Sequence, residues 1–598
     1  MSQIESQPTG LSLMQAVAVG VNTTSPAFSL AAILAPMALL VGYSTPIVLI
    51  VSFIPMALTS VAFMYLNRRD PDCGTTFSWV TRAIGPHSGF IAGWTIAAAG
   101  MLVLGSLAET AITYSFLTFG FEDLAGNALL VRICAAILII VMTGLSILGS
   151  DSSIRLQTIL TFAQITILLI FAIAAAVLAV NRTLPSLTSD WYNPLSQGLE
   201  PLIAAMLLGV FAFWGWEAAT NLSEECRKPS DAGKAGVLST IILLTTYVLV
   251  AAFVVIYLGE SGFYPVGESG LVLVDMSGVV LGPFAFLVLI AVALSALAST
   301  QSTMVPGSRA VLSMARRGAL PQRLGLTHPR FKSPWVSLAI LGGIAATWYF
   351  VVSSISANAL TDTLSSLGIL VAFYYSITGI ACVIYYRKHV TASFKGFLLV
   401  GLGPIIGSLG LLFMLIVGII SVADPANSAT GSPWLGLAPP LTIAALMIAL
   451  GIIAMLVRMR IFPSFFSAPR EIASHMQSPF PLGSDIPIPP GGILIDCNNS
   501  LNIIQEMIME RADSFKQFNP VTMVFGVHPS GISGEEFLEA REALVEDAHE
   551  IFSQVERTLK SLGVKKVHRI FAETDAKESV DSAIGLSEPE LVLTHQIR

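Results

Sequence analysis

Residues 21–27 read Val21-Asn22-Thr23-Thr24-Ser25-Pro26-Ala27 and interrupt an apolar run that extends from Leu13 to about Leu40. Proline has no backbone N–H and its ring clashes with the preceding helical turn, so a helix that passes through this stretch should open. Thr24-Ser25-Pro26 also has the order of a helix start, a hydroxyl N-cap followed by proline at the first position. The run is long enough to cross a membrane. The stretch therefore predicts a spanning helix made of two half-helices with an irregular joint.

A second break of the same kind lies farther along the chain. Residues 211–217 read Phe211-Ala212-Phe213-Trp214-Gly215-Trp216-Glu217 and lie inside the sixth apolar run. Either break alone is more simply a proline kink or a close-packing glycine. Breaks in the first and sixth spans, however, have the spacing of a five-plus-five inverted repeat with the binding site between the broken helices. The helix start at Ser25, Ala27 and Phe28 would offer N–H groups to an anionic ligand group, and the other broken ends would offer carbonyls to a cation.

The composition indicates a membrane protein. Of the 598 residues, 54% are apolar and only 12% are charged, whereas soluble domains carry roughly 25% charged residues. About twelve apolar runs reach the roughly 20 residues needed to cross the hydrocarbon core. They lie near residues 13–40, 45–66, 89–119, 128–149, 155–180, 200–223, 236–258, 281–314, 336–354, 364–386, 395–422 and 436–460. The sequence thus predicts an all-α membrane protein with about twelve transmembrane helices.

The loops between these runs alternate in charge. One set is basic, as at Arg68 and Arg69, and the alternate set is mostly acidic, as at Glu122 and Asp123. Because basic loops stay on the cytoplasmic side, this alternation predicts an even number of spans with both termini inside the cell, in the plasma (cell inner) membrane.

The chain changes character near its end. Residues 463–490 are rich in Pro and Ser, which is typical of a linker. In residues 491–598, strands alternate with helices, which predicts a small, doubly wound cytoplasmic α/β domain. The remaining boundaries are an N-terminal cytoplasmic tail over residues 1–12 and a transmembrane domain over residues 13–462.

Several classes of function are disfavoured. The net charge of −7 argues against nucleic acid. The five cysteines are scattered and lack metal-ligand spacing. We find no catalytic constellation, and therefore expect neither an enzyme nor a bound cofactor or metal.

Three further stretches carry a resemblance. Glu224-Glu225-Cys226-Arg227-Lys228-Pro229 follows the sixth break, Ala315-Arg316-Arg317-Gly318-Ala319-Leu320-Pro321 ends the eighth span, and Pro71-Asp72-Cys73-Gly74 precedes the third span. With the sixth-span break, they make residues of about 10–465 similar to the amino acid–polyamine–organocation permeases. The resemblance implies the LeuT-like fold with its inverted repeat, and transport of a small-molecule substrate across the lipid bilayer by alternating access.

The resemblance also implies a substrate site. In amino-acid members of the family, the first helix unwinds at a Gly-Ser-Gly whose N–H groups cradle the substrate carboxylate. Thr24-Ser25-Pro26 occupies that place here and keeps only the serine, so amines and other small metabolites gain weight as substrates. The aromatic residues of the sixth break could line the site or simply pack. The predicted substrate-binding residues are Asn22, Thr23, Thr24, Ser25, Ala27, Phe213, Trp214, Gly215 and Trp216.

Coupling residues are predicted beside that site. Some family members carry a Lys in the fifth helix that is tied to proton coupling, and Gln164 stands in its place here; glutamine cannot titrate. Ser299 and Ser302 could give oxygens to sodium, or bond back to their own helix. Glu217, an ionisable residue inside a span, could carry a proton or hold the broken helix ends. The coupling ion is therefore expected to be a proton or sodium.

The C-terminal domain resembles the universal-stress-protein fold, which suggests regulation or pairing of two copies as a homodimer. We expect secondary active uptake of an amino acid. The alternatives are a polyamine, amine or other small-metabolite permease, and an inorganic-cation (potassium) symporter regulated by its C-terminal domain.

Overall fold

The computed structural model of the protein describes most of the chain. The described residues are 11–148, 151–180, 188–258, 272–331, 333–356, 358–390, 394–425, 428–467, 493–498, 501–510, 521–526, 535–562, 564, 567–572 and 591–593. The chain divides into two compact units, a helical unit of residues 1–68 and 73–474 and a C-terminal unit of residues 69–72 and 475–598. The N-terminal tail up to residue 10 and the linker from residue 468 lie outside the described residues, so these boundaries stay predictions.

Eleven helical stretches among the described residues are long and apolar enough to span a membrane. The first runs for 57 residues, from Leu13 to Arg69, which is enough for two crossings of about 20 residues each. The crossings are α1 (Leu13–Thr24) with α2 (Pro26–Val41), α3 (Thr45–Arg69), α5 (Pro86–Thr118), α7 (Ala128–Leu148), α8 (Asp151–Val180), α9 (Leu199–Ala212) with η3 (Trp216–Glu225), α10 (Pro229–Leu258), α13 (Phe286–Ser302) with α14 (Met304–Arg316), α15 (Trp335–Ile355), α16 (Ala359–Tyr385), η7 (Phe397–Leu402) with α19 (Gly403–Ser421), and α20 (Pro439–Ile461).

Shorter helices connect the crossings. They are η1 (Gly42–Ser44), α4 (Thr76–Ala83), α6 (Glu122–Ala125), η2 (Ser189–Trp191), α12 (Val272–Leu281), η5 (Gly282–Phe284), η6 (Gln322–Gly325), α17 (Arg387–Val390), α18 (Phe394–Gly396) and α21 (Ser464–Ser467).

Local sequence signals set several helix starts. Ser12 and Gln15 form a reciprocal capping box that begins α1. Proline, whose missing N–H costs nothing in the first turn, begins α2, α5, α10 and α20. The seventh crossing consequently starts at Pro229, earlier than the predicted residue 236.

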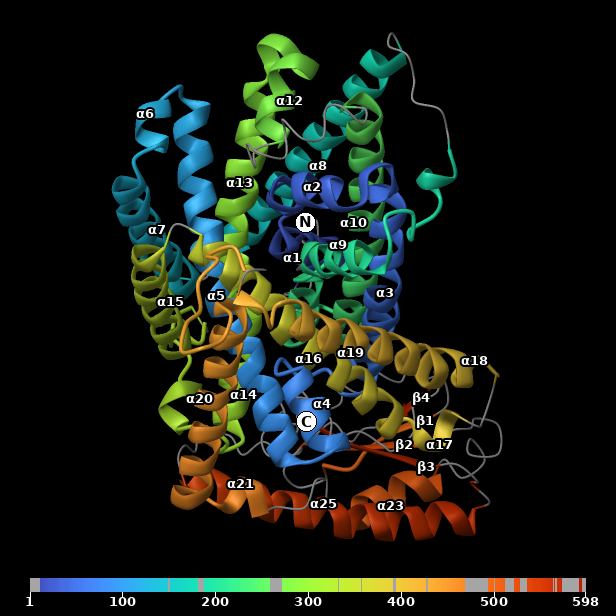
Figure 1. Cartoon of the computed structure of the whole chain (residues 1–598). Helices are drawn as coiled ribbons and strands as arrows, with labels where there is room; N and C mark the ends of the chain where they lie inside the picture. Colours follow the sequence, from blue (N-terminus) through green and yellow to red (C-terminus); the bar gives the residue numbers. More distant parts are fainter. Residues whose placement is uncertain are drawn as a thin grey trace, which may run out of the picture. The chain divides into compact units, whose positions relative to one another are not determined.

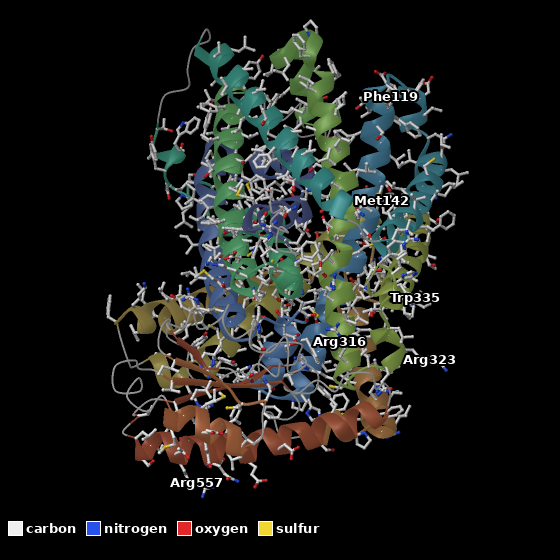
Figure 2. The ribbon with its side chains drawn as sticks, turned by 180° about the vertical axis from the view of Figure 1, so that it is seen from behind. Phe119, Met142, Arg316, Arg323, Trp335 and Arg557 are labelled. Carbon is white, nitrogen blue, oxygen red and sulfur yellow. The ribbon has the colours of Figure 1, made fainter. Side chains whose placement is uncertain are left out.

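Burial separates central from peripheral crossings. In the most apolar window of each stretch, 89% of the residues are buried in α5, 78% in the sixth crossing and 72% in α16, against 22% in α7 and 28% in α20. Exposed apolar side chains such as Phe119 and Trp335 point outward, as contact with lipid requires (Figure 2). Figure 1 shows α1, α2 and α9 grouped beside α8 and α10. The broken helices therefore lie inside the helical unit.

Both predicted breaks are present. The first crossing is interrupted at Ser25, and the sixth between Ala212 and Trp216. Each set of five crossings therefore begins with a broken helix, which confirms the predicted fold class. The eighth crossing continues through Thr303 as one helical stretch, as the sequence predicts, because Thr303 has helical backbone angles (φ −65°, ψ −20°) and its N–H donates to the Ser299 carbonyl at 2.8 Å.

The C-terminal unit contains a parallel sheet with the strand order β3-β2-β1-β4. The strands are β1 (Ile493–Asp496), β2 (Val521–Gly526), β3 (Val567–Ala572) and β4 (Leu591–Leu593). Ile493 pairs with both Val521 and Leu591. The helices α23 (Leu501–Glu510) and α25 (Glu535–Ser561) contribute Ile504 and Phe552 to its apolar core. The predicted α/β pattern is confirmed, and the universal-stress-protein resemblance stays a prediction.

Candidate functional site

The right-handed helix of the first crossing is interrupted at Ser25. This residue has φ 56° and ψ 67°, a left-handed conformation that is uncommon outside glycine. Its N–H donates to the carbonyls of Val21 and Asn22 at 3.1 and 3.0 Å, and its carbonyl accepts the N–H of Ser29 at 2.8 Å. The helix α1 ends and α2 begins at this one residue.

The start of α2 presents uncapped backbone donors. Pro26 has no N–H, and Ser25 makes no side-chain capping bond. Within the described part of the chain, no acceptor contacts the N–H groups of Ala27 and Phe28. Two donors with the positive end of a helix behind them can therefore bind an anionic or carbonyl oxygen of a ligand.

Hydroxyl groups satisfy the carbonyls that end α1. Ser299 Oγ of α13 donates to the Thr23 carbonyl at 2.9 Å, and Ser29 Oγ donates to the Thr24 carbonyl at 2.7 Å. Ser299 Oγ also lies 3.2 Å from Thr303 Oγ1. The oxygens of Thr23, Ser299 and Thr303 thus form a cluster of the kind that hard cations such as sodium prefer.

The break in the sixth crossing lies directly on the break in the first. Gly215 has φ +115° and ψ −15°, and a Cβ added to it would be 2.9 Å from the Thr23 carbonyl carbon and 2.9 Å from the Thr24 nitrogen. A side chain at this position would collide with backbone and would also strain its own. Glycine therefore permits the two irregular segments to touch.

A buried carboxylate sits just after this contact. Glu217 is 1% exposed, and its Oε2 accepts the Gly215 N–H at 3.1 Å and the Tyr375 hydroxyl at 2.5 Å. The Tyr374 hydroxyl donates to Oε1 and accepts the indole N–H of Trp214 at 2.5 Å. A chain of hydrogen bonds therefore runs from Trp214 through Tyr374 to Glu217, and it joins the sixth crossing to α16.

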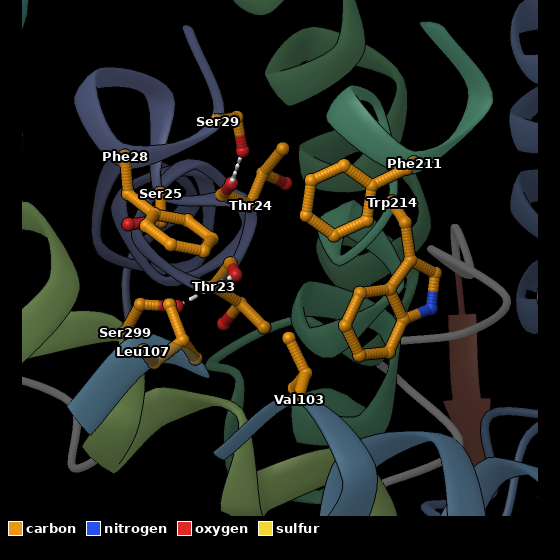
Figure 3. A pocket seen from close by; sticks show the side chains of 10 residues that line it. All are labelled: Thr23, Thr24, Ser25, Phe28, Ser29, Val103, Leu107, Phe211, Trp214 and Ser299. Atoms are coloured by element: carbon orange, nitrogen blue, oxygen red, sulfur yellow. Dashed lines mark hydrogen bonds between the residues drawn. The ribbon is translucent and has the colours of Figure 1, made fainter. Parts of the chain in front are cut away.

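A small cavity lies between the two breaks, and Figure 3 shows Phe28 facing Phe211 and Trp214 across it. The space that the centre of a water-sized sphere can reach is about 10 Å³, which is room for about one water molecule. An amino acid does not fit, so a ligand of that size requires the helices to move apart. The lining residues are Thr23, Thr24, Ser25, Phe28, Ser29, Val103, Leu107, Phe211, Trp214 and Ser299.

The predicted site residues fall into two groups. Those that line the cavity are Thr23, Thr24, Ser25, Trp214 and Ser299. Those that lie outside its lining are Asn22, Ala27, Gln164, Phe213, Gly215, Trp216, Glu217 and Ser302.

Gln164 reaches the first crossing but not the cavity. Its Nε2 donates to Asn22 Oδ1 at 2.9 Å, and Asn22 Nδ2 donates to the Gln157 carbonyl at 2.7 Å. Within the described residues, the buried Gln164 Oε1 has no partner. The two amides join α8 to α1 less than one turn before Ser25.

The aromatic neighbours of Trp214 have packing positions. The Phe213 ring lies 5.3 Å from Phe53 and 5.2 Å from Tyr247. The Trp216 ring lies 5.0 Å from Phe63. Both aromatic residues are fully buried in the helix bundle, away from the cavity lining.

The sequence did not predict several residues that line the cavity or bind Glu217. Val103 and Leu107 of α5 line the cavity, but they carry no signal that separates them from lipid-facing residues. Tyr374 and Tyr375 did carry one, because two adjacent phenol hydroxyls inside an apolar span need partners there. Their partner is the carboxylate that the sequence had already marked.

Backbone hydrogen bonds tie the far end of η3 to the start of α1. The Leu11 N–H donates to the Glu225 carbonyl at 2.8 Å, and the Arg227 N–H donates to the Leu11 carbonyl at 2.9 Å. Leu11 and Cys226 thus form a parallel bridge. The start of the first crossing and the end of the sixth crossing are joined there.

Ion pairs tie the same end of η3 to α14. Arg309 pairs with Glu225, and Arg316 Nη1 lies 3.1 Å from Glu224 Oε2. Glu224 Oε1 also accepts the Cys73 N–H at 3.0 Å. These contacts hold this end of η3 against α14, and they would have to break for the two to separate.

Comparisons with known proteins identify the family. The sequence pattern of the family described as amino acid permease matches residues 11–469. The chain is 23% identical over 344 residues to the vacuolar cationic amino acid transporter 2 of Arabidopsis thaliana, covering 56% of this chain and 53% of that one. It is 24% identical over 366 residues to the methylthioribose transporter of Bacillus subtilis, covering 58% and 76%. The match therefore spans about half the length of the plant relative. Among solved structures, MhsT in complex with L-phenylalanine has a TM-score of 0.49 and 17% identity, covering 68% of this chain and 100% of that chain.

Proposed function

The chain belongs to the amino acid permease family, since the family pattern matches residues 11–469, and from this membership we propose that it takes up an amino acid by ion-coupled alternating access. One observation carries the proposal. The breaks of the first and sixth crossings touch at Gly215 and Thr23 beside a buried cavity. Irregular backbone at membrane depth is tolerated only where it is buried in protein or lines a cavity, and discontinuous helices of this kind form the substrate site of many transporters.

The cavity offers groups suited to both ends of an amino acid. Phe28, which lines the cavity and has an open N–H, suits a carboxylate. The hydroxyl oxygens of Thr23, Thr24 and Ser25 carry lone pairs that suit an ammonium. Recognition of this kind needs no charged side chain in the lining.

Alternating access requires this conformation to open. The cavity has room for about one water molecule, about 10 Å³ for the centre of a water-sized sphere, so an amino acid cannot enter it in this conformation. The ion pairs Arg309–Glu225 and Arg316–Glu224 close one end. Their separation would free η3 and α1 to move away from α14 and expose the cavity at that end.

The proposal includes two alternative sites at which an ion would couple to transport. Glu217 would carry a proton, since a carboxylate that gains or loses one must rearrange the tyrosines that contact it. Alternatively, sodium would bind the oxygens of Thr23, Ser299 and Thr303. The identity of the ion, proton or sodium, whose imposed gradient drives uptake separates the two.

We place the protein in the plasma membrane with both termini in the cytoplasm, on the strength of the alternating basic loops. The C-terminal α/β unit would then be cytoplasmic and would regulate transport or pair two copies. Measuring the mass of the full chain in detergent, with and without residues 491–598, tests the pairing. Equal oligomeric states would exclude this unit as the contact.

Uptake into proteoliposomes tests the transport function. The panel contains labelled amino acids, putrescine, methylthioribose and rubidium, each with an imposed proton or sodium gradient. Amino acid accumulation driven by one gradient is expected. Uptake of rubidium alone, or of no solute under any gradient, would overturn the proposal. Within the described residues of the first break, no acidic side chain is present to hold a bare potassium ion.

A further inference from the structure

The cavity lining points to a narrower substrate class. We propose that the transported molecule carries an uncharged, mainly apolar side chain, as in leucine, valine or methionine, and that Val103 and Leu107 of α5 select it. This inference rests on the proposed amino acid transport. The inference concerns the side chain of the substrate, which differs from one amino acid to another.

The cavity lining contains two chemical kinds of side chain, which lie intermixed, with Phe28 beside Ser25 and Leu107 beside Ser299 (Figure 3). We call the hydroxyl-bearing residues the polar wall; they are Thr23, Thr24, Ser25, Ser29 and Ser299. We call the apolar residues the apolar wall; they are Phe28, Val103, Leu107, Phe211 and Trp214. Among the described residues that line the cavity, none is ionisable. A substrate with hydrogen-bonding groups and an uncharged, apolar side chain matches this lining.

The hydroxyls of the polar wall already donate within their own helix. Thr23 Oγ1 donates to the Val19 carbonyl at 2.8 Å, and Thr24 Oγ1 donates to the Gly20 carbonyl at 3.0 Å. Such hydroxyls keep only lone pairs for a ligand. Together with the N–H groups at the start of α2, they provide acceptors and donors for the invariant ammonium and carboxylate groups. The apolar wall is left for the variable group.

The buried carboxylate of the sixth crossing is engaged by partners outside the cavity. Glu217 lies outside the lining, and its oxygens accept bonds from Tyr374, Tyr375 and the Gly215 N–H. The Trp214 indole donates to Tyr374 and lines the cavity itself. A lysine or arginine side chain in the cavity would therefore face aromatic and aliphatic carbon, and would lose its hydration without reaching a counter-charge.

Val103 and Leu107 are one helical turn apart and lie on the same face of α5. Both side chains line the cavity opposite the broken helices, and Figure 3 shows Val103 below Trp214 and Leu107 below Phe28. Neither side chain has a polar atom. Their size and charge can consequently change without removing any hydrogen bond of the site.

Competition against labelled leucine uptake in proteoliposomes tests the inference. Unlabelled isoleucine, valine, methionine and phenylalanine are compared with lysine, arginine, ornithine and glutamate. The apolar competitors should have half-inhibitory concentrations lower than those of the charged ones by about tenfold or more, the factor that hydrophobic pockets commonly achieve. Uptake of lysine or arginine in preference to leucine would overturn the inference while leaving amino acid transport intact. Uptake of methylthioribose with no amino acid transported would instead overturn the proposed function.

A matched pair of variants sharpens the test. Leu107→Asp places a carboxylate in the apolar wall, and should weaken leucine uptake and bring lysine uptake above background. Leu107→Asn has nearly the same shape without the charge, and should weaken leucine uptake without the gain for lysine. Equal lysine uptake by the two variants would remove Leu107 from the selecting wall. The competition panel on the unaltered protein decides the substrate class even where a variant does not fold.

Discussion

Gly215 lies against Thr23 so closely that a Cβ on the glycine would be 2.9 Å from the threonine carbonyl carbon. The two broken crossings therefore touch backbone to backbone. Gly215→Ala should force the breaks apart and also place a side chain at φ +115°, a conformation whose strain is about 1–3 kcal/mol. We expect uptake to fall by about tenfold or more, which corresponds to roughly 1.4 kcal/mol.

The control for this variant is Gly343→Ala in α15, where an added Cβ meets no atom within 4 Å. It should leave the initial uptake rate unchanged. If Gly215→Ala transports as well as Gly343→Ala, the contact between the breaks is not required for function.

Trp214 combines two roles that substitution can separate. Trp214→Phe keeps a ring against the cavity but removes the donor to Tyr374, so uptake should persist at a reduced rate, with a loss near the ~1 kcal/mol of one neutral hydrogen bond. Trp214→Ala also removes the ring, and should abolish uptake while the protein stays folded by size-exclusion chromatography. Trp335→Ala, at a tryptophan that is 40% exposed on the outside of the bundle, is the control. Normal kinetics in Trp214→Ala would assign this residue to packing alone.

Glu217→Gln tests proton coupling at the buried carboxylate. The amide oxygen can still accept from one of the two tyrosines, the amide nitrogen can only donate to the other, and the side chain cannot gain or lose a proton. Uptake driven by a pH gradient should disappear, whereas exchange of labelled for unlabelled substrate at equal pH should remain. Glu109→Gln changes another carboxylate of a spanning helix, one that accepts a hydrogen bond from Tyr349 at 2.8 Å, and should keep both activities. Persistent pH-driven uptake in Glu217→Gln would show that Glu217 is not the proton carrier. Uptake driven by sodium alone would instead favour the oxygens around Ser299 as the coupling site.

Gln164→Leu should act on stability rather than on coupling. It removes the donor to Asn22 Oδ1, and leaving a buried acceptor unsatisfied costs about 1–3 kcal/mol. We expect a lower melting temperature in detergent and an unaltered dependence of uptake on pH. The exposed Gln322→Leu serves as the comparison. A shifted pH profile in Gln164→Leu alone would contradict the view that this position takes no part in proton movement.

The bridge between Leu11 and Cys226 predicts that α1 and η3 move together. Leu11 and Cys226 lie directly opposite each other in this isolated bridge, which brings their Cα atoms near the separation that a disulfide needs, so Leu11→Cys should crosslink to the native Cys226 under oxidation. Because two backbone hydrogen bonds already join these segments, the crosslinked protein should retain uptake. Leu11→Cys combined with Cys226→Ser is the control. Loss of uptake that dithiothreitol restores would show that the two segments separate during transport.

The sequence was sufficient to predict the broken crossings, because a polar stretch with proline or glycine inside an apolar run can hardly continue as a regular helix. It also singled out Ser25, Trp214 and Glu217. It could not identify the contact of Gly215 with Thr23, since close approach between distant segments leaves no local pattern.

The apolar residues that line the cavity could not be predicted, for a related reason. In a spanning helix, lipid and core are equally apolar, so Val103 and Leu107 do not differ from residues that face the bilayer. In contrast, Trp216 was expected at the substrate because of its place in the break, and its ring packs against Phe63 instead. Position along the chain fixed the depth of these side chains but not the side of the helix on which they lie.

The contracted cavity also has a consequence for measured affinity. A conformation with about 10 Å³ of reachable space excludes the substrate, so only the fraction of molecules in a wider conformation can bind. The apparent dissociation constant is the intrinsic constant divided by that fraction. Substitutions that loosen the closed end, such as Glu225→Gln at the Arg309 pair, would then strengthen equilibrium binding even while they slow the transport cycle. The same ion pair would thus act on affinity and on turnover in opposite directions.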